Sequence, residues 1–582
     1  MSGNRFISRS FAVLAAVALG TAALPSPAMA CGGFFCSANA PVNQAAERII
    51  FSKNADDTVT AVVQIQYSGP SEEFAWVLPV PGVPEVNVSS DLAFQRLQAV
   101  SNPQYITTQV VEGQCGVLEN NADFGPTSFG TGGSGGGGGS SGADDREVNV
   151  LAEGNVGPYD FVVIQTDPAS ASAGDVAVEW LTTEGYDVVP PGGDPASISE
   201  LLGSYLEGGM NLLAFRLTKG NATGTIRPIW ITYDSDQPMI PIRPTAVAAD
   251  DDMGVLVWVL GDHRAVPVNY RSLVLNEALI DWPQAAANYN QVVIAAANEA
   301  GGQGFVTERA GAAGDYEDVV ISEFELGNWD FLSTTTELTS ADLLSESAFM
   351  FVAWDGYRDV VARYLPEDID VDGFLQCPVC EPNQLDFDLV IDQEAFIEDM
   401  EGEVIDPMIA TQELLLSRPY VTRLYTTLSA PEMDLDPLFD FNPDLEGASN
   451  LHNATQVIEC SPGVTFAEAP SRFELEDGQV VRLAAGAPWP FAPGDDGGLP
   501  ANAQILQLST SGEGSVIQNN AAAISTAVAN HNDTVPPPPA GFNVTGGACA
   551  AHADARAASG FVAALLVGMA LLVTRRRRRT QR

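Results

Sequence analysis

Apolar and polar residues alternate along much of the first half of the chain, which predicts β-strands. Val59, Ala61, Val63, Ile65 and Tyr67 recur at every second position, as in a strand with one buried face. Further strands are expected at residues 74–80, 161–165, 212–217, 226–233 and 254–260.

Helical spacing appears at separate places between these strands. Leu92, Leu97 and Val100 follow Ser90, a residue type that often caps helix N-termini. Other helices are expected at residues 175–183, 197–206 and 285–300, and in the later half at residues 343–364 and 393–424. The sequence therefore predicts an α+β fold with a strand-rich first half and a more helical later half.

The first 30 residues have the pattern of a secretory signal peptide. Arg5 and Arg9 precede an apolar run over residues 11–24, and Ala28-Met29-Ala30 supplies small residues for cleavage. Cys31 comes next, where a lipoprotein signal would place an acylated cysteine. Such signals usually have Leu at the position of Ala28, so ordinary cleavage is favoured over lipidation.

The C-terminal end predicts a membrane anchor. We expect a Pro-rich linker at residues 531–548 and an anchor at residues 549–582, with an apolar run over residues 561–573. The arginines that follow this run favour a cytoplasmic end, so residues 31–530 would form the exported part. The alternative is a core helix with a basic end.

This tail resembles the MYXO-CTERM sorting signal of myxobacterial surface proteins. The resemblance consists of a cysteine, a short hydrophobic helix and an arginine cluster, in that order. It implies cleavage near the cysteine by a membrane-embedded sorting protease, followed by display on the outer surface. The sorting residues would be Cys549, Arg575, Arg576, Arg577, Arg578 and Arg579.

The charge of the exported part is strongly negative. The chain has 26 Lys and Arg against 75 Asp and Glu, and nine of the bases with one of the acids lie in the two terminal segments. The 17 remaining bases therefore face 74 acids. Such a surface repels nucleic acid and attracts cations, and it also suits a salty habitat. A Gly/Ser-rich loop at residues 130–142 interrupts this part.

Several phrases resemble a bacterial family called domain of unknown function 2330. The resemblance spans most of residues 31–460, and it implies export but no particular activity. The phrases are Cys31–Cys36, Phe74–Pro81, Val156–Tyr159, Trp180-Leu181 with Gly185-Tyr186, Pro241–Arg243 and Arg418–Thr427.

Six cysteines outside the tail predict disulfides, because their number is even and the chain is exported. They are Cys31, Cys36, Cys115, Cys377, Cys380 and Cys460, and the sequence leaves their 15 pairings open. Cys377-Pro-Val-Cys380 has the spacing of redox and zinc sites. A structural bridge is favoured there, because the surroundings are acidic and no second pair of this kind exists.

Other candidate chemistry is sparse. Asp368, Asp370 and Asp372, followed by Gly373, resemble the start of a calcium loop, although Val379 stands where the loop's bidentate acid belongs. A calcium site is one interpretation and a chance match in an acidic chain is the other. His263 follows Asp262 after a strand, which suggests a turn with an ion pair rather than a catalytic pair.

These features predict an exported surface protein anchored in the envelope of a Gram-negative bacterium. We expect a non-enzymatic binding or structural module that contacts the membrane through its C-terminal helix and does not bind nucleic acid. The alternative is a secreted hydrolase that uses acidic residues, with calcium as a potential cofactor.

Overall fold

A computed structural model of the chain describes residues 34–36, 43–68, 74–115, 148–167, 172–186, 188, 194–217, 227–247, 249–335, 337–380, 383–462, 464–493 and 498–536. The expected signal peptide, Gly/Ser-rich loop and anchor lie outside these residues, together with Cys31 and Cys549. Within them, no helix is long and apolar enough to span a bilayer.

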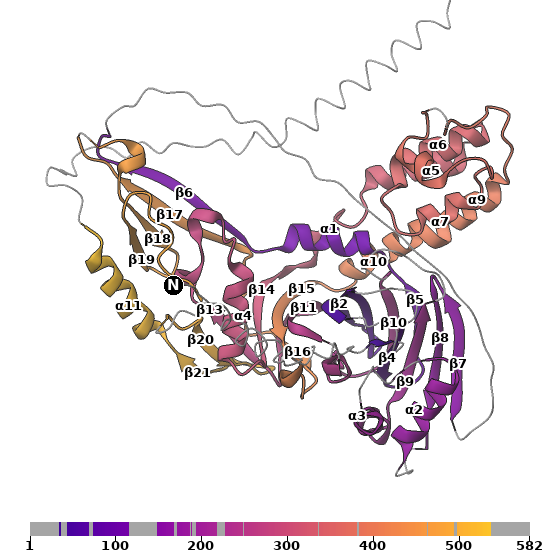
Figure 1. The fold of residues 1–582 in the computed structure, drawn as a ribbon, viewed down its shortest axis with the longest axis horizontal. Coiled ribbons are helices and arrows are strands. Elements are labelled where there is room, and N and C mark those ends of the chain that lie inside the picture. Colours follow the sequence, from indigo (N-terminus) through magenta and orange to yellow (C-terminus); the bar gives the residue numbers. More distant parts are fainter. Residues whose placement is uncertain are drawn as a thin grey trace, which may run out of the picture.

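The first layer of the described fold is a five-stranded antiparallel sheet (Figure 1). Its strands, in spatial order, are β1 (Phe34–Cys36), β4 (Phe74–Val80), β9 (Asn211–Leu217), β8 (Tyr159–Gln165) and β7 (Asn149–Val156). Helices α2 (Ala173–Thr183) and α3 (Pro195–Glu207) cover its outer face with apolar side chains such as Leu181 and Leu202. The helices touch at Gly174, where a Cβ would lie 1.8 Å from the Ser199 backbone oxygen.

The second layer is a ten-stranded mixed sheet among the described residues. Its spatial order is β21 (Ser515–Asn519), β20 (Asn502–Gln507), β13 (Arg271–Leu275), β14 (Gly304–Ala312), β15 (Tyr420–Leu428), β11 (Ala249–Gly261), β2 (Asn43–Lys53), β3 (Thr58–Ser68), β10 (Ile229–Asp234) and β5 (Glu85–Val88). The β2–β11 and β13–β14 pairs are parallel and the other pairs are antiparallel.

A hydrophobic core fills the space between these two sheets. Inward side chains of β2 and β3, such as Ile49 and Val63, meet side chains of β4 and β9, such as Leu78 and Phe215. Trp76 stacks on Phe215 with ring centroids 5.4 Å apart. The alternation read from residues 59–67 correctly predicts a strand, but not its single buried face, because Thr60, Val62 and Gln64 on the opposite face are also buried.

Helices cover the opposite face of the ten-stranded sheet and extend from it as an arm (Figure 1). They are α1 (Asp91–Ser101), α5 (Glu323–Thr334), α6 (Ser340–Phe351), α7 (Tyr357–Ala362), α8 (Val371–Gln376), α9 (Gln393–Met400) and α10 (Asp406–Leu416), with a π-helical turn, η5 (Glu401–Ile405), between the last two. Short 3-10 turns lie at η1 (Pro244–Val247), η2 (Glu277–Leu279), η3 (Trp282–Gln284), η4 (Ala313–Tyr316), η6 (Ala430–Glu432) and η7 (Phe466–Glu468).

A second arm on the other side carries the last part of the chain (Figure 1). Its four-stranded sheet has the order β19 (Val480–Leu483), β18 (Ser471–Leu475), β17 (Leu451–Glu459) and β6 (Gln104–Glu112). Helices α4 (Tyr289–Glu299) and α11 (Ala521–Thr534) share a core with it. A small pair, β12 (Arg264–Pro267) and β16 (Phe439–Asn442), completes the fold.

The mixed α+β class is confirmed: the early part of the chain is strand-rich, and helices α5 to α10, between residues 323 and 416, lie in its later half. The predicted helix over residues 393–424 is wrong beyond Leu416, because β15 begins at Tyr420. Pro419 disfavours a helical conformation in the residue before it, and the β-branched residues that follow favour a strand. The predicted helix over residues 343–364 is interrupted at Gly356, whose φ is +84°.

Ser90 lies at the expected N-cap of α1, but its hydroxyl does not accept from the helix backbone. The Ser90 hydroxyl donates to Asp355, and the Asp355 carboxylate accepts from the Leu92 backbone N–H in its place.

Two disulfides lie in the described residues, as the even number of cysteines suggested. Cys115 and Cys460, with Cα atoms 4.8 Å apart, join the ends of the parallel neighbours β6 and β17 across 345 residues of sequence. Cys377 and Cys380 form the short bridge with Cα atoms 5.4 Å apart. The first bridge fixes a long-range strand pair, and the second joins the two cysteines of the CxxC pair to each other.

Candidate functional site

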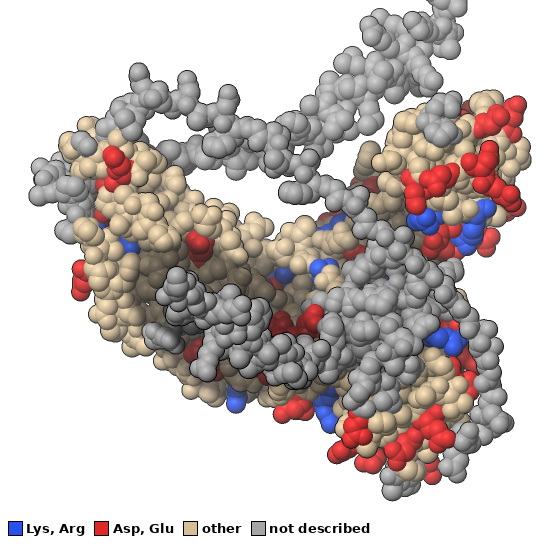
Figure 2. Space-filling model, in the orientation of Figure 1, with Lys and Arg blue, Asp and Glu red and all other residues tan. Residues whose placement is uncertain are grey.

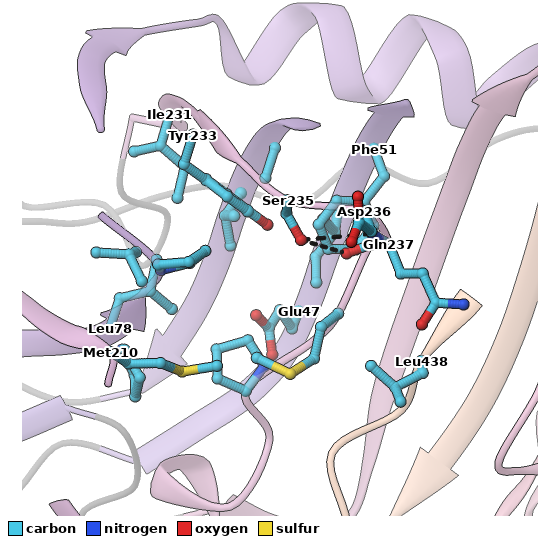
Figure 3. Close-up of a pocket in the computed structure, with 18 residues that line it drawn as sticks. Glu47, Phe51, Leu78, Met210, Ile231, Tyr233, Ser235, Asp236, Gln237 and Leu438 are labelled. Atoms are coloured by element: carbon cyan, nitrogen blue, oxygen red, sulfur yellow. Dashed lines mark hydrogen bonds between the residues drawn. The ribbon is translucent and has the colours of Figure 1, made fainter. Parts of the chain in front are cut away.

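A cavity of about 270 Å³ lies between the two large sheets, and Figure 3 shows the side chains around it. Its size is close to the lower limit of ligand pockets, roughly 300–1,000 Å³. Most of its walls are apolar and come from strands of both sheets. They include Ile49 and Phe51 of β2, Val63 of β3, Ile231 of β10, and Leu78 and Val80 of β4.

One wall residue, Glu47, carries a carboxyl group. In β2 it follows the same alternation as Ile49 and Phe51, so its side chain faces the cavity. The pairing of β2 with β3 shifts register between Gln44 and Ala46, which is a β-bulge. In a regular strand, residues three apart face opposite sides of the sheet. The extra residue of the bulge places the Gln44 side chain on the same face as Glu47.

Glu47 is deeply buried, with 6% of its surface exposed. Among the described residues, its one hydrogen bond comes from the Gln44 side-chain amide, at a long 3.5 Å to Glu47 Oε2. Desolvation raises the pKa of the Glu47 carboxyl from 4.5 to about 7, and the bond from Gln44 opposes the rise. Gln44 Oε1 is itself buried without a hydrogen-bond partner among these residues.

The charged groups in the lining are all acidic. Asp236, exposed at the loop after β10, is the second carboxylate, and no described lining residue is a lysine, arginine or histidine. Lys53 lies nearby, but its ammonium group donates to the Ser235 backbone oxygen at 2.8 Å and lies 3.7 Å from Asp57. The ammonium group therefore already has two oxygen partners.

Polarizable side chains complete the lining. Met210, which precedes β9, and Met239, in the loop after β10, both contribute to it. Phe51 and Tyr233 add aromatic rings, and Figure 3 shows them with Met210 and Glu47 among the lining side chains. Methionine adapts to ligands of different shape, and aromatic faces attract cations.

A second, more polar region lies on the other face of the ten-stranded sheet. Glu308 and Arg423 form an ion pair there whose side chains are 1% and 4% exposed. The Tyr289 hydroxyl donates to Glu308 Oε1 at 2.6 Å, and Arg423 donates to Ser101 Oγ at 2.7 Å and Asn102 Oδ1 at 2.8 Å. Since both charged groups are fully hydrogen-bonded, this pair holds β14, β15 and α1 together.

Next to this pair, His452 and Glu277 line a cavity of about 260 Å³. His452 Nδ1 lies 2.9 Å from Glu277 Oε1, and the imidazole ring stacks on Tyr105 with centroids 4.5 Å apart. Glu277 Oε2, Thr307 Oγ1 and Arg264 Nε are buried without a hydrogen-bond partner within the described residues. His452 lies in β17.

Two of the three calcium candidates, Asp370 and Asp372, have other partners in the structure. Asp370 caps α8 by accepting from the Gly373 backbone at 2.7 Å, and Asp372 accepts from Arg358 at 3.0 Å. No group of three or more His, Cys, Asp or Glu residues that could hold a metal occurs in the described ranges. His263 lies exposed in the turn between β11 and β12, and the neighbouring Asp262 pairs with Arg418 at 2.6 Å.

The sequence analysis did not identify Glu47. The available signal was its position, because Glu47, Ile49 and Phe51 alternate in a strand where a glutamate would share a face with two large apolar residues. A carboxylate at an inward position breaks the alternation, and such breaks mark functional sites.

Comparison with known proteins places most of these cavity residues in one family. Residues 25–342 match the family described as "Uncharacterized protein conserved in bacteria (DUF2330)", which is more than half of the chain. The chain belongs to this family. Apart from Leu438, every lining residue of the Glu47 cavity lies in the DUF2330 match, whereas Arg423 and His452 lie beyond it. No curated protein and no solved structure matches the chain.

Proposed function

We propose that this DUF2330 protein is an exported, envelope-anchored binding protein without enzymatic activity, and that it holds a small, largely apolar ligand between its two large sheets. The observation that carries the proposal is the cavity of about 270 Å³, whose apolar walls surround the buried carboxyl of Glu47. Pockets with mostly apolar walls and a few placed polar groups are the usual form of small-molecule sites.

Export and anchoring rest on the two ends of the chain and on the disulfides. The first 30 residues have the pattern of a signal peptide, and the last 34 have the cysteine, apolar run and arginine cluster of a MYXO-CTERM-like tail. Two disulfides in the folded part suit an oxidising compartment. Protease added to whole cells should cleave the folded part, and an intact chain recovered from the cytosol would contradict this location.

Binding is tested with 1-hexanol as an uncharged probe of the cavity. The full chain in lipid nanodiscs is titrated by calorimetry, with empty nanodiscs as the blank. Ala61, which is 2% exposed, lines the cavity, so Ala61→Leu should fill it and remove binding. The matched control is Ala196→Leu at an exposed position of α3.

Hydrogen exchange gives a second measurement that does not depend on a variant. Because β2 and β3 form one wall, 1-hexanol should slow amide exchange in peptides from these two strands of the wild-type chain. The absence of both a heat of binding and protection in these strands would refute the proposed site.

One observation favours the alternative of a hydrolase that uses acidic residues. Glu277 Oε2 is buried without a partner among the described residues and faces the same cavity as His452 and Glu308. An acid paired with an imidazole can act in proton transfer. The alternative predicts hydrolysis of ester or glycoside substrates that Glu277→Gln abolishes, and no turnover in the wild-type chain would refute it.

A further inference from the structure

We infer that the cavity between the two sheets selects an organic cation, with a short apolar body and a protonated amine head that pairs with Glu47. This inference rests on the proposed function, because it names the ligand class of the same cavity.

The first argument is the missing counter-charge. Glu47 is 6% exposed, and its one hydrogen bond among the described residues is the 3.5 Å contact from the neutral Gln44 amide. Burying a carboxylate is costly unless it is paired and hydrogen-bonded. A ligand ammonium group next to Glu47 would supply both the charge and the hydrogen-bond donors that the protein itself leaves out.

The second argument is the charge of the whole lining. Glu47 and Asp236 are its two ionisable acids, and the described lining includes no basic side chain. Lys53 contacts the lining at the Ser235 carbonyl, and its ammonium group also lies 3.7 Å from Asp57. An anionic head would therefore meet repulsion from two carboxylates, whereas a cation would be attracted by both.

The third argument is the chemistry of the remaining walls. Phe51 and Tyr233 add aromatic rings to the walls farther along the strands from Glu47, where the apolar body would lie. Met210 and Met239 provide polarizable contacts for the apolar body. These walls suit an alkylammonium ion better than a metal ion, which needs several oxygen ligands.

The electrostatic field around the protein also favours a cationic ligand. Between the two terminal segments, 17 bases face 74 acids, and the surface in Figure 2 shows many more acidic than basic side chains. Such a field raises the local concentration of cations and steers them toward the surface.

The test compares three soluble probes of equal chain length on the full chain in nanodiscs: hexylammonium, 1-hexanol and hexanoate. We expect hexylammonium to bind at least about tenfold more tightly than 1-hexanol, which corresponds to one modest charge pair. Hexanoate should bind the most weakly of the three.

The decisive variant is Glu47→Gln, which keeps the shape of the side chain and removes its charge. It should weaken hexylammonium binding by about tenfold or more and change 1-hexanol binding by less than about threefold. Glu47→Asp, which restores the charge, should recover part of the preference for the cation. Glu207→Gln, an exposed position at the end of α3, serves as the charge-matched control.

The outcomes separate the two proposals. Equal binding of hexylammonium and 1-hexanol, or tightest binding of hexanoate, would overturn the cation inference and leave the binding function intact. A cation preference that survives Glu47→Gln would also overturn it. If no probe binds, the proposed function itself fails.

Discussion

Replacing Glu47 by Gln should change how the stability of the protein depends on pH. Burial raises the pKa of this carboxyl from 4.5 in the unfolded chain to about 7 in the folded protein. A difference of this size corresponds to about 3 kcal/mol, since each pKa unit is about 1.36 kcal/mol. The group is deeply buried, so solvent screening reduces this figure little.

The sign follows from proton binding. Between pH 4.5 and about 7 the folded protein holds a proton on Glu47 that the unfolded chain has lost. The free energy of unfolding therefore falls by up to about 3 kcal/mol as the pH rises through this window, and stays lower above it. The amide that replaces the carboxyl in Glu47→Gln does not titrate, so the variant lacks this loss.

The assay is urea unfolding of the full chain and of Glu47→Gln between about pH 5 and 8.5, without added ligand. The difference between the two unfolding free energies cancels the titration of the other acids. From the low to the high end of this pH range, the variant should become more stable relative to the wild type by roughly 2–3 kcal/mol. Glu207→Gln, an exposed substitution, should follow the wild type throughout. Parallel curves for wild type and Glu47→Gln would refute the raised pKa.

Three further predictions concern other parts of the chain. Arg423→Met should destabilise the fold by about 3–5 kcal/mol because it leaves Glu308 buried and unpaired, and adding Glu308→Gln should recover part of the loss in urea unfolding. Cys460→Ser should lower the free energy of unfolding by roughly 3–5 kcal/mol, since the bridge to Cys115 closes a loop of 345 residues. Alkylation of the unreduced wild-type protein should label neither cysteine, and label on both would contradict the pairing. Cys549→Ala should hold the protein in the inner membrane, and unchanged surface display in cell fractionation would oppose the proposed sorting.

Local patterns of the sequence predict where the helices and strands of this fold lie, but not which of them are neighbours in space. The strand at Phe74–Val80 and the helix from Asp91 follow directly from apolar spacing. The same spacing continues past Leu416, where one proline separates a helix from a central strand, so the predicted boundary was wrong. Periodicity alone does not distinguish a short buried strand from a buried helical turn.

Long-range pairings have no local signal. Cys115 and Cys460 approach because β6 and β17 are parallel neighbours, with Glu112 opposite Glu459 in the register. Nothing within either strand specifies that partner, and sequence counting alone left 15 pairings for six cysteines. The Glu47 cavity is hidden for the same reason, because its walls come from two sheets whose packing is decided by the whole fold.

The burial of Glu47 in this position is itself an argument for a ligand. Above neutral pH, the ligand-free protein with a charged Glu47 is less stable by about 3 kcal/mol than the same protein with a neutral group at this position. This cost is a large fraction of a typical net stability of roughly 5–15 kcal/mol. A glutamine or an apolar side chain at the same position of β2 would avoid that cost. A cation bound to the folded state would offset it, because a ligand that binds only the folded protein stabilises it according to its concentration and affinity. Local features that lower stability without a structural benefit are expected where a site serves function. On this reasoning, hexylammonium should raise the urea midpoint of the wild type at about pH 8.5 more than that of Glu47→Gln, even though the variant is the more stable protein without ligand.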